Sequence, residues 1–201
     1  MIRVVLIEDQ TMMRDALVTL LDLERDIDVV GAVATAEAAM TTIDEVRPDV
    51  ALVDIELPGM DGLALAEMLT DVAPTCRVVI VTTFGRPGYL RRAIAANVAG
   101  FVLKDMSAGE LASVVRQVYE GERVIDAALA LSALREGDDP LTRRERDVLR
   151  VARESMSIAE IAGRLYLSEG TVRNYLSSAI QKLGVRNRAE AIATAEQKGW
   201  L

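Results

Sequence analysis

Polar side chains that could do chemistry follow four short apolar runs of the sequence, each at the residue where the run ends. Each of them alone is an ordinary polar residue at the start of a loop. Together they supply three carboxylates, a hydroxyl and an ammonium group, which suit a site that binds a cation next to an anion. These residues are Glu8 and Asp9, Asp54, Thr82 and Lys104.

The apolar runs indicate why these side chains should meet. Five short β-branched segments alternate with stretches in which apolar residues recur at helical spacing. Such alternation predicts a parallel sheet covered by helices on both faces, with the carboxyl ends of its strands at one edge, where ligands bind. We therefore predict a five-stranded α/β domain over residues 1–121. The segments are 4–7, 29–33, 50–53, 78–81 and 100–103.

Carboxylates in close contact repel one another unless a cation lies between them. Mg²⁺, a hard ion that prefers oxygen ligands, would remove this repulsion. A carboxylate can also attack phosphorus and form an acyl phosphate. Mg²⁺ would then bridge Asp9, Asp54 and the phosphoryl oxygens, while Lys104 and Thr82 would bind the remaining oxygens. The residues therefore predict magnesium-dependent phosphoryl transfer to an aspartate.

Composition excludes several classes of site. The 201 residues contain no histidine, which excludes histidine metal sites, histidine-based triads and a histidine phosphodonor within this chain. A single cysteine excludes an internal disulfide and fits a reducing compartment. No run approaches the roughly 20 apolar residues of a membrane helix. We expect a cytoplasmic protein without membrane insertion.

Charge is distributed unevenly along the chain. Residues 1–121 hold 10 basic and 19 acidic side chains, whereas residues 140–201 hold 11 basic and 7 acidic ones. This asymmetry predicts two domains with different partners, the basic one suited to an anion. The charged stretch 135–140 contains a glycine and a proline, which are typical of a linker. We therefore assign 122–139 to a linker.

Residues 140–201 are predicted to form a small all-α domain. Capping residues and glycines indicate four helices, at about 142–153, 157–164, 168–183 and 188–198. The second and third are joined by a short turn, and each has an apolar stripe for burial.

The third helix has a polar face whose residue types suit DNA. Arginine and asparagine read guanine and adenine edges, and serine permits close approach to the groove. The alternative is a helix pair whose basic residues are only solvated, and we favour that interpretation for 142–153, where Arg143 and Arg144 are candidate phosphate contacts. The candidate DNA contacts are Thr171, Arg173, Asn174, Tyr175, Ser177, Ser178, Lys182, Arg186 and Arg188.

The order of the acidic, hydroxyl and lysine residues, with Pro58-Gly59 after Asp54, resembles the receiver domain of two-component response regulators over residues 1–121. The resemblance implies a flavodoxin-like fold with strand order 2-1-3-4-5 and a sensor histidine kinase as phosphodonor. Leu57 departs from the usual methionine, and Asp105 stands where many receivers have proline. The implied roles are phosphoacceptor for Asp54, direct Mg²⁺ ligand for Asp9, ligand through water for Glu8, main-chain ligand for Glu56, and switch residues for Thr82 and Phe101.

The stretches LTRRERDVL, EIAGRLYLSEGTVRNYL and KLGVRNRAEA resemble the LuxR-type helix-turn-helix of NarL/FixJ-family regulators across residues 141–192. Tyr166 stands where that family often has glycine. TTFGRPGYLRRAI, GTVRNYLS and the ending KGW are most similar to the DesR subgroup. The resemblance implies a transcriptional regulator that forms a homodimer on phosphorylation, binds double-stranded promoter DNA and contacts RNA polymerase.

Two alternatives come from other classes of protein. A haloacid-dehalogenase-type phosphatase also uses an aspartate after a strand, but it typically has a second acid two residues on, followed by threonine. Here Glu56 is followed by Leu57 and Pro58. An atypical regulator would bind DNA independently of phosphorylation and lose the acidic residues, which this chain retains. The sequence leaves open the cognate kinase and its signal, the operator, activation or repression, phosphoryl lifetime, the dimerising face and the domain arrangement.

Overall fold

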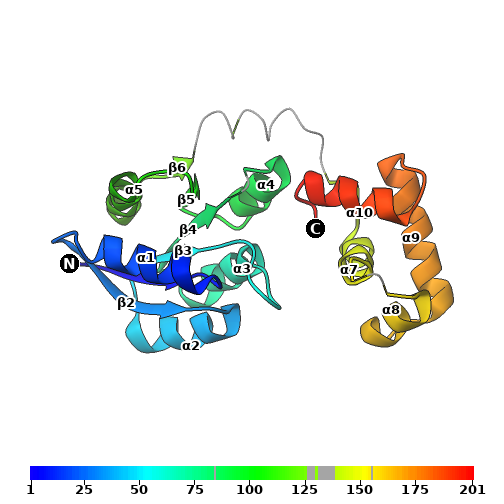
Figure 1. Ribbon diagram of the computed structural model, residues 1–201, viewed down its shortest axis with the longest axis horizontal. Helices are drawn as coiled ribbons and strands as arrows, with labels where there is room; N and C mark the ends of the chain where they lie inside the picture. Colours follow the sequence, from blue (N-terminus) through cyan, green and yellow to red (C-terminus); the bar gives the residue numbers. More distant parts are fainter. Residues whose placement is uncertain (84, 126–129, 131–138, 155) are drawn as a thin grey trace. The chain divides into compact units, whose positions relative to one another are not determined.

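The structure, a computed structural model, describes residues 1–83, 85–125, 130, 139–154 and 156–201. The chain divides into two compact units, an N-terminal α/β unit and a C-terminal helical unit (Figure 1). Most of the predicted linker, residues 126–129 and 131–138, lies outside the described residues. Among the described residues, no helix combines the length and the apolar character needed to cross a bilayer.

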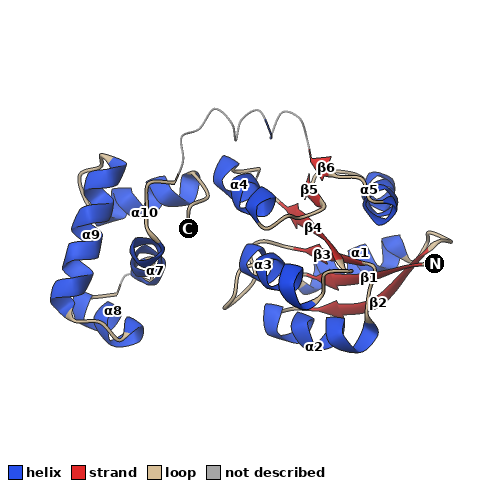
Figure 2. Ribbon diagram, turned by 180° about the vertical axis from the view of Figure 1, so that it is seen from behind, coloured by secondary structure: helices blue, strands red, loops and turns tan. Residues whose placement is uncertain are grey.

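The N-terminal unit is a parallel sheet with helices on both faces (Figure 2). Its strand order is β2-β1-β3-β4-β5-β6, and every neighbouring pair is parallel. The predicted order 2-1-3-4-5 is therefore confirmed, with one strand added at the β5 edge. The strands are β1 (Ile2–Ile7), β2 (Ile27–Val33), β3 (Val50–Val53), β4 (Arg77–Thr82), β5 (Gly100–Leu103) and β6 (Val124–Ile125).

Alternate strand residues point to opposite faces of the sheet, both covered by helices, which is why the central strand β3 is apolar and buried throughout. One buried cluster joins Val4 and Leu6 of β1 to Leu111 and Val115 of α5, and closes one face of the sheet. The helices of this unit are α1 (Thr11–Leu21), α2 (Ala36–Val46), α3 (Gly62–Val72), α4 (Pro87–Ala95) and α5 (Ala108–Glu120).

The additional strand β6 lies inside the segment predicted as linker. The Val124 amide donates to the Ala99 carbonyl at 2.9 Å, and the Arg123 guanidinium donates to the Asn97 side chain at 2.6 Å. Two strand residues are too few to produce a periodic signal, so the sequence could not reveal this pairing.

The C-terminal unit contains the four predicted helices. Its core brings together Val148 and Leu149 of α7, Ile161 of α8 and Val172 of α9, all fully buried. Each helix begins at a side-chain N-cap. The helices are α7 (Arg143–Ala152), α8 (Ile158–Leu165), α9 (Glu169–Leu183) and α10 (Arg188–Gln197).

The turn between α8 and α9 keeps a left-handed residue. Tyr166 ends α8 with φ 54° and ψ 43°, the region that glycine adopts most readily, and its residue surface is 96% exposed. The tyrosine at a position often occupied by glycine therefore does not change the handedness of the turn.

Candidate functional site

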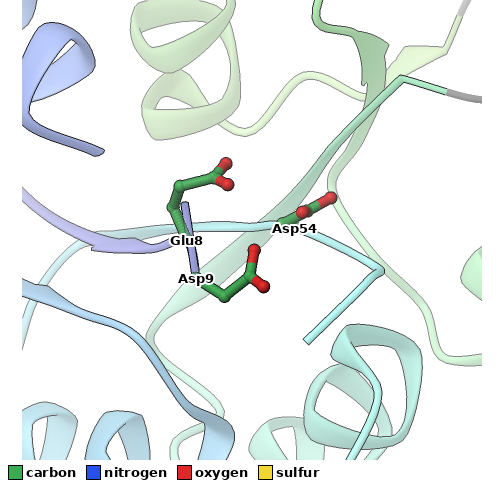
Figure 3. A group of neighbouring side chains, drawn as sticks. All are labelled: Glu8, Asp9 and Asp54. Carbon is green, nitrogen blue, oxygen red and sulfur yellow. The ribbon is translucent and has the colours of Figure 1, made fainter. Parts of the chain in front are cut away.

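An acidic pocket lies at the carboxyl edge of the sheet. Glu8 and Asp9 follow β1, Asp54 follows β3, and one carboxylate oxygen of each lies within 4.8 Å of the others (Figure 3). Glu8 and Asp54 are buried, whereas Asp9 is exposed. The parallel topology gathers these side chains because both strands end at the same edge. Three convergent carboxylates are donors that suit a hard divalent cation such as Mg²⁺.

Lys104 reaches this pocket from the end of β5. Its Nζ lies 2.7 Å from Glu8 Oε2 and 3.0 Å from Asp54 Oδ2, and its side chain is 6% exposed. Burial disfavours the ammonium form, but hydrogen bonds to Glu8 and Asp54 outweigh burial and raise the pKa of Lys104. One ammonium thus faces two buried carboxylates with a third nearby, which leaves an excess of negative charge for a cation to neutralise.

Thr82 and Phe101 lie on the two strands beside the pocket. Both are fully buried, and the Lys104 amide donates to the Thr82 carbonyl at 2.8 Å, so β4 and β5 end side by side. Glu56, two residues after Asp54, is exposed. The bond between Lys104 and Asp105 is trans, as an ordinary non-proline bond would be.

The loop after Asp54 contains a positional requirement that the sequence analysis missed. A Cβ at Gly62 would lie 1.9 Å from the Asp54 carbonyl oxygen, so only glycine permits this approach. The Gly62 amide donates to the Ile55 carbonyl at 3.0 Å and closes the loop. The glycine that follows Asp61 in the sequence was the available signal. Leu57 is buried at 8% exposure and is a packing residue.

The polar face of α9 divides into two groups of side chains. Arg173, Asn174 and Ser177 are exposed and lie on successive turns of the helix. The Arg173 Nη2 also donates to Glu169 Oε2 at 2.8 Å, one turn earlier on the same helix. Guanidinium, amide and hydroxyl groups on one exposed face can read base edges in a major groove.

Ser178 and Lys182 instead contact the buried carboxylate of Glu145 on α7, although the Lys182 side chain remains 34% exposed. The Ser178 hydroxyl donates to Glu145 Oε1 at 2.6 Å, and Lys182 Nζ lies 2.8 Å from Glu145 Oε2. Glu145 is 3% exposed and also accepts the Thr142 amide as part of a capping box. Burial alone would raise the pKa of Glu145, but the hydrogen bonds from Lys182, Ser178 and Thr142 lower it to about 2.

The other candidate DNA contacts have partners within the unit as well. Arg188 donates to the Ala152 carbonyl at 2.5 Å and to the Met156 carbonyl at 2.7 Å, and so caps the end of α7. The remaining contacts are a hydrogen bond of 2.8 Å between the Ser168 and Thr171 hydroxyls, packing of Tyr175 against the core, and an ion pair of 2.7 Å between Arg186 and Glu190.

Two protein-family models match the chain: the response regulator receiver domain over residues 4–116 and the bacterial regulatory proteins of the luxR family over residues 139–195. Two Bacillus subtilis proteins are each 44% identical to it. For the uncharacterized transcriptional regulatory protein YvfU, the match covers 100% of both chains. For the transcriptional regulatory protein DesR, it covers 100% of this chain and 99% of DesR. The Salmonella typhimurium RcsB response regulator has a similar fold, with a TM-score of 0.66 at 22% identity, covering 98% of this chain and 100% of that one.

Proposed function

Because this chain belongs to the response regulators that join a receiver domain to a LuxR-family regulatory domain, we propose that phosphorylation of Asp54 by a sensor histidine kinase controls its binding to promoter DNA. The protein is a transcriptional regulator rather than an enzyme, and the phosphatase alternative is set aside by this membership. The observation that carries the proposal is the buried Asp54 carboxylate, 3.0 Å from the Lys104 ammonium and beside Glu8 and Asp9.

The transfer requires one bond to form and one to break. An Asp54 carboxylate oxygen attacks phosphorus on the kinase phosphohistidine, and the new P–O bond forms as the P–N bond breaks. The ring nitrogen leaves with the bonding electrons, and the proton on the other ring nitrogen makes the leaving group a neutral imidazole. Mg²⁺, when bound by Asp9, Asp54, the Glu56 carbonyl and, through water, Glu8, supplies positive charge to the phosphoryl oxygens. Lys104 is already close enough to Asp54 to bind one of those oxygens.

The product would change the charge balance of the pocket. An acyl phosphate adds about −1.5 to −2 charge. We expect Lys104 to turn from Glu8 toward the phosphoryl group and the Thr82 hydroxyl to bind another of its oxygens. In this proposal the phosphorylated state holds the buried ring of Phe101 inward together with Thr82.

The output is binding of double-stranded DNA by α9. Its exposed residues Arg173, Asn174 and Ser177 would enter the major groove, and two chains joined as a homodimer would contact half-sites about one helical turn apart. RNA polymerase is a further proposed partner at the promoter. We place the protein in the cytoplasm, where the DNA lies.

Asp54→Ala tests the phosphoacceptor. Wild-type protein incubated with acetyl phosphate and Mg²⁺ should gain the mass of one phosphoryl group, whereas the variant should gain none. Asp105→Ala removes an exposed acid next to Lys104 and should label normally. Full labelling of Asp54→Ala would overturn the assignment.

Sizing and DNA binding, each with and without beryllofluoride, test the coupling between the two units. We expect the activated chain to elute as a dimer and to bind DNA more tightly. Equal DNA affinity in both states would support a regulator that is independent of phosphorylation.

A further inference from the structure

The recognition helix α9 begins differently from the other three helices of its unit. Helices α7, α8 and α10 follow an N-cap residue with glutamate at the third helical position, in the sequences TRRE, SIAE and NRAE. Helix α9 begins SEGT, with threonine at the third position and Glu169 at the first. Among the four described helices of this unit, α9 therefore differs in having its glutamate two positions closer to the N-cap.

This shift changes what the carboxylate binds. In the other three helices the glutamate turns back to a main-chain amide: Glu145 to Thr142 at 2.6 Å, Glu160 to Ser157 at 2.7 Å and Glu190 to Arg186 at 3.0 Å. These contacts satisfy amides at the helix start.

In α9 the Ser168 hydroxyl alone accepts the Thr171 amide, at 3.1 Å. Glu169 instead points along the helix and accepts the Arg173 guanidinium at 2.8 Å. Glu169 thus binds the Arg173 side chain, and the N-cap of α9 forms without a contribution from Glu169.

Stability does not explain this ion pair. Its side chains are 57% exposed for Arg173 and 50% exposed for Glu169, and exposed pairs one turn apart contribute little to folding. A negative charge on a surface that meets phosphates also weakens DNA binding. An acidic residue in the first turn also stabilises the helix through its dipole, but that effect does not depend on a contact with Arg173. We therefore relate the contact between Glu169 and Arg173 to DNA binding.

A guanidinium reads guanine through two parallel hydrogen bonds, which require a fixed plane. Glu169 accepts a hydrogen bond from Nη2 of Arg173, and this hydrogen bond does not involve Nη1. Gly170, between the N-cap and Arg173, adds no side chain here, and outside the helix backbone the Ser168 hydroxyl is the only described atom within 4 Å of where its Cβ would be.

We infer that Glu169 is a positioning residue that sets base specificity by orienting Arg173, at some expense of general DNA affinity. This inference rests on the proposed DNA-binding function. It differs from a simple repulsive role in one measurable respect: removing the charge should strengthen binding to any duplex but weaken discrimination between sequences.

The test uses the full-length chain activated with beryllofluoride and Mg²⁺. A pool of randomised 30-base-pair duplexes is selected with wild-type protein, and the recovered sequence and a scrambled duplex then serve as probes. Glu169→Gln and Glu169→Ala are compared with Glu154→Gln. Glu154 is a matched control because it is 55% exposed, pairs with Arg164 and lies outside α9. Arg173→Ala identifies the base positions that Arg173 reads.

We expect both Gln variants to bind the scrambled duplex a few-fold more tightly, because each removes one negative charge. Glu154→Gln should keep the base preferences of wild type. Glu169→Ala should lose about tenfold in discrimination at the positions assigned to Arg173, and Glu169→Gln less, since its amide oxygen still accepts a hydrogen bond. In the Arg173→Ala background, Glu169→Ala should have no further effect on discrimination.

Unchanged base preferences in Glu169→Ala, with selection succeeding for wild type, would overturn this inference and leave the proposed function intact. Failure of wild-type protein to enrich any sequence would overturn the proposed function and this inference with it. Thermal unfolding of each variant separates a loss of preference from a loss of folding.

Discussion

Each unit of the protein buries one glutamate and pairs it with a lysine, but the surroundings of the two pairs differ. In the α/β unit, Glu8 lies 2.7 Å from Lys104; in the helical unit, Glu145 lies 2.8 Å from Lys182. The glutamate side chains are 2% and 3% exposed. The distances and the burial of the glutamates therefore do not distinguish the two pairs, although the Lys104 side chain is 6% exposed and that of Lys182 is 34% exposed.

The balance of charge and donors does distinguish them. Glu145 receives Lys182, the Ser178 hydroxyl and the Thr142 amide, so one carboxylate is neutralised by one ammonium with its oxygens satisfied. Lys104 is shared between Glu8 and Asp54, with Asp9 nearby. A buried pair with balanced charge holds a structure together, whereas a surplus of carboxylates provides a site for a cation and an incoming phosphoryl group.

Glu145→Gln should have the largest effect on stability. It leaves Lys182 without its charged partner and weakens the capping box, so we expect a loss of about 3 kcal/mol in urea unfolding. Glu190→Gln is the matched control, because Glu190 occupies the same helix position but pairs with the highly exposed Arg186. That variant should lose less than about 1 kcal/mol. Equal losses would remove the distinction between a buried and an exposed pair.

The stability difference between wild type and Glu145→Gln should also depend on pH. The pKa of Glu145 is about 2 in the folded protein against a reference value of 4.5, so its contribution to stability is complete above about pH 4.5. That contribution is lost as the pH falls from 4.5 toward 2. The stability difference between wild type and Glu145→Gln should therefore shrink over this range, and a constant difference would contradict the lowered pKa.

Lys104→Gln tests the excess of carboxylates around the pair in the α/β unit. Lys104 competes with a cation for Glu8 and Asp54, so removing it should strengthen Mg²⁺ binding. We expect Mg²⁺ to stabilise this variant by about 1 kcal/mol more than it stabilises wild type in urea unfolding. Lys182→Gln should show no added response to Mg²⁺, since within the described part of the chain the group of carboxylates that could hold a cation is Glu8, Asp9 and Asp54 and does not include Glu145. A Mg²⁺ response in both variants would mean that charge balance does not define the site.

Ser178→Ala should have the smallest effect. Its hydroxyl donates to Glu145 rather than to the exposed face of α9, so we expect about 1 kcal/mol of lost stability and unchanged base preferences. The measurements are urea unfolding and selection from the randomised duplex pool. An altered base preference would place Ser178 among the residues that read DNA.

The acidic pocket could be assembled from the sequence because strand topology fixes where strand ends meet. Glu8, Asp54 and Lys104 follow separate apolar runs, and a parallel sheet leaves one edge for all of them. The close approach of Gly62 to the Asp54 carbonyl could not be predicted in the same way. It depends on how the loop folds back, which no periodic pattern reports.

The roles of the polar side chains of α9 were harder to predict from the sequence, because side chains with different partners are of similar residue types. Arg173 and Lys182 are both basic and both exposed, yet Arg173 pairs with Glu169 on its own helix whereas Lys182 pairs with the buried Glu145. The partner that decides between them, Glu145, lies 37 residues earlier, and the sequence alone did not connect the two. Local spacing predicted the approximate positions of these helices, while long-range pairing required the structure.

The two-residue strand β6 has a practical consequence for preparing the receiver alone. A sheet that ended at β5 would present unpaired main-chain groups at Gly100 and Phe101, and such edges recruit strands from other molecules. Val124 and Ile125 cover both positions. A fragment cut after residue 121 would expose this edge and tend to aggregate, whereas one that continues through residue 125 would carry its own protection against self-association.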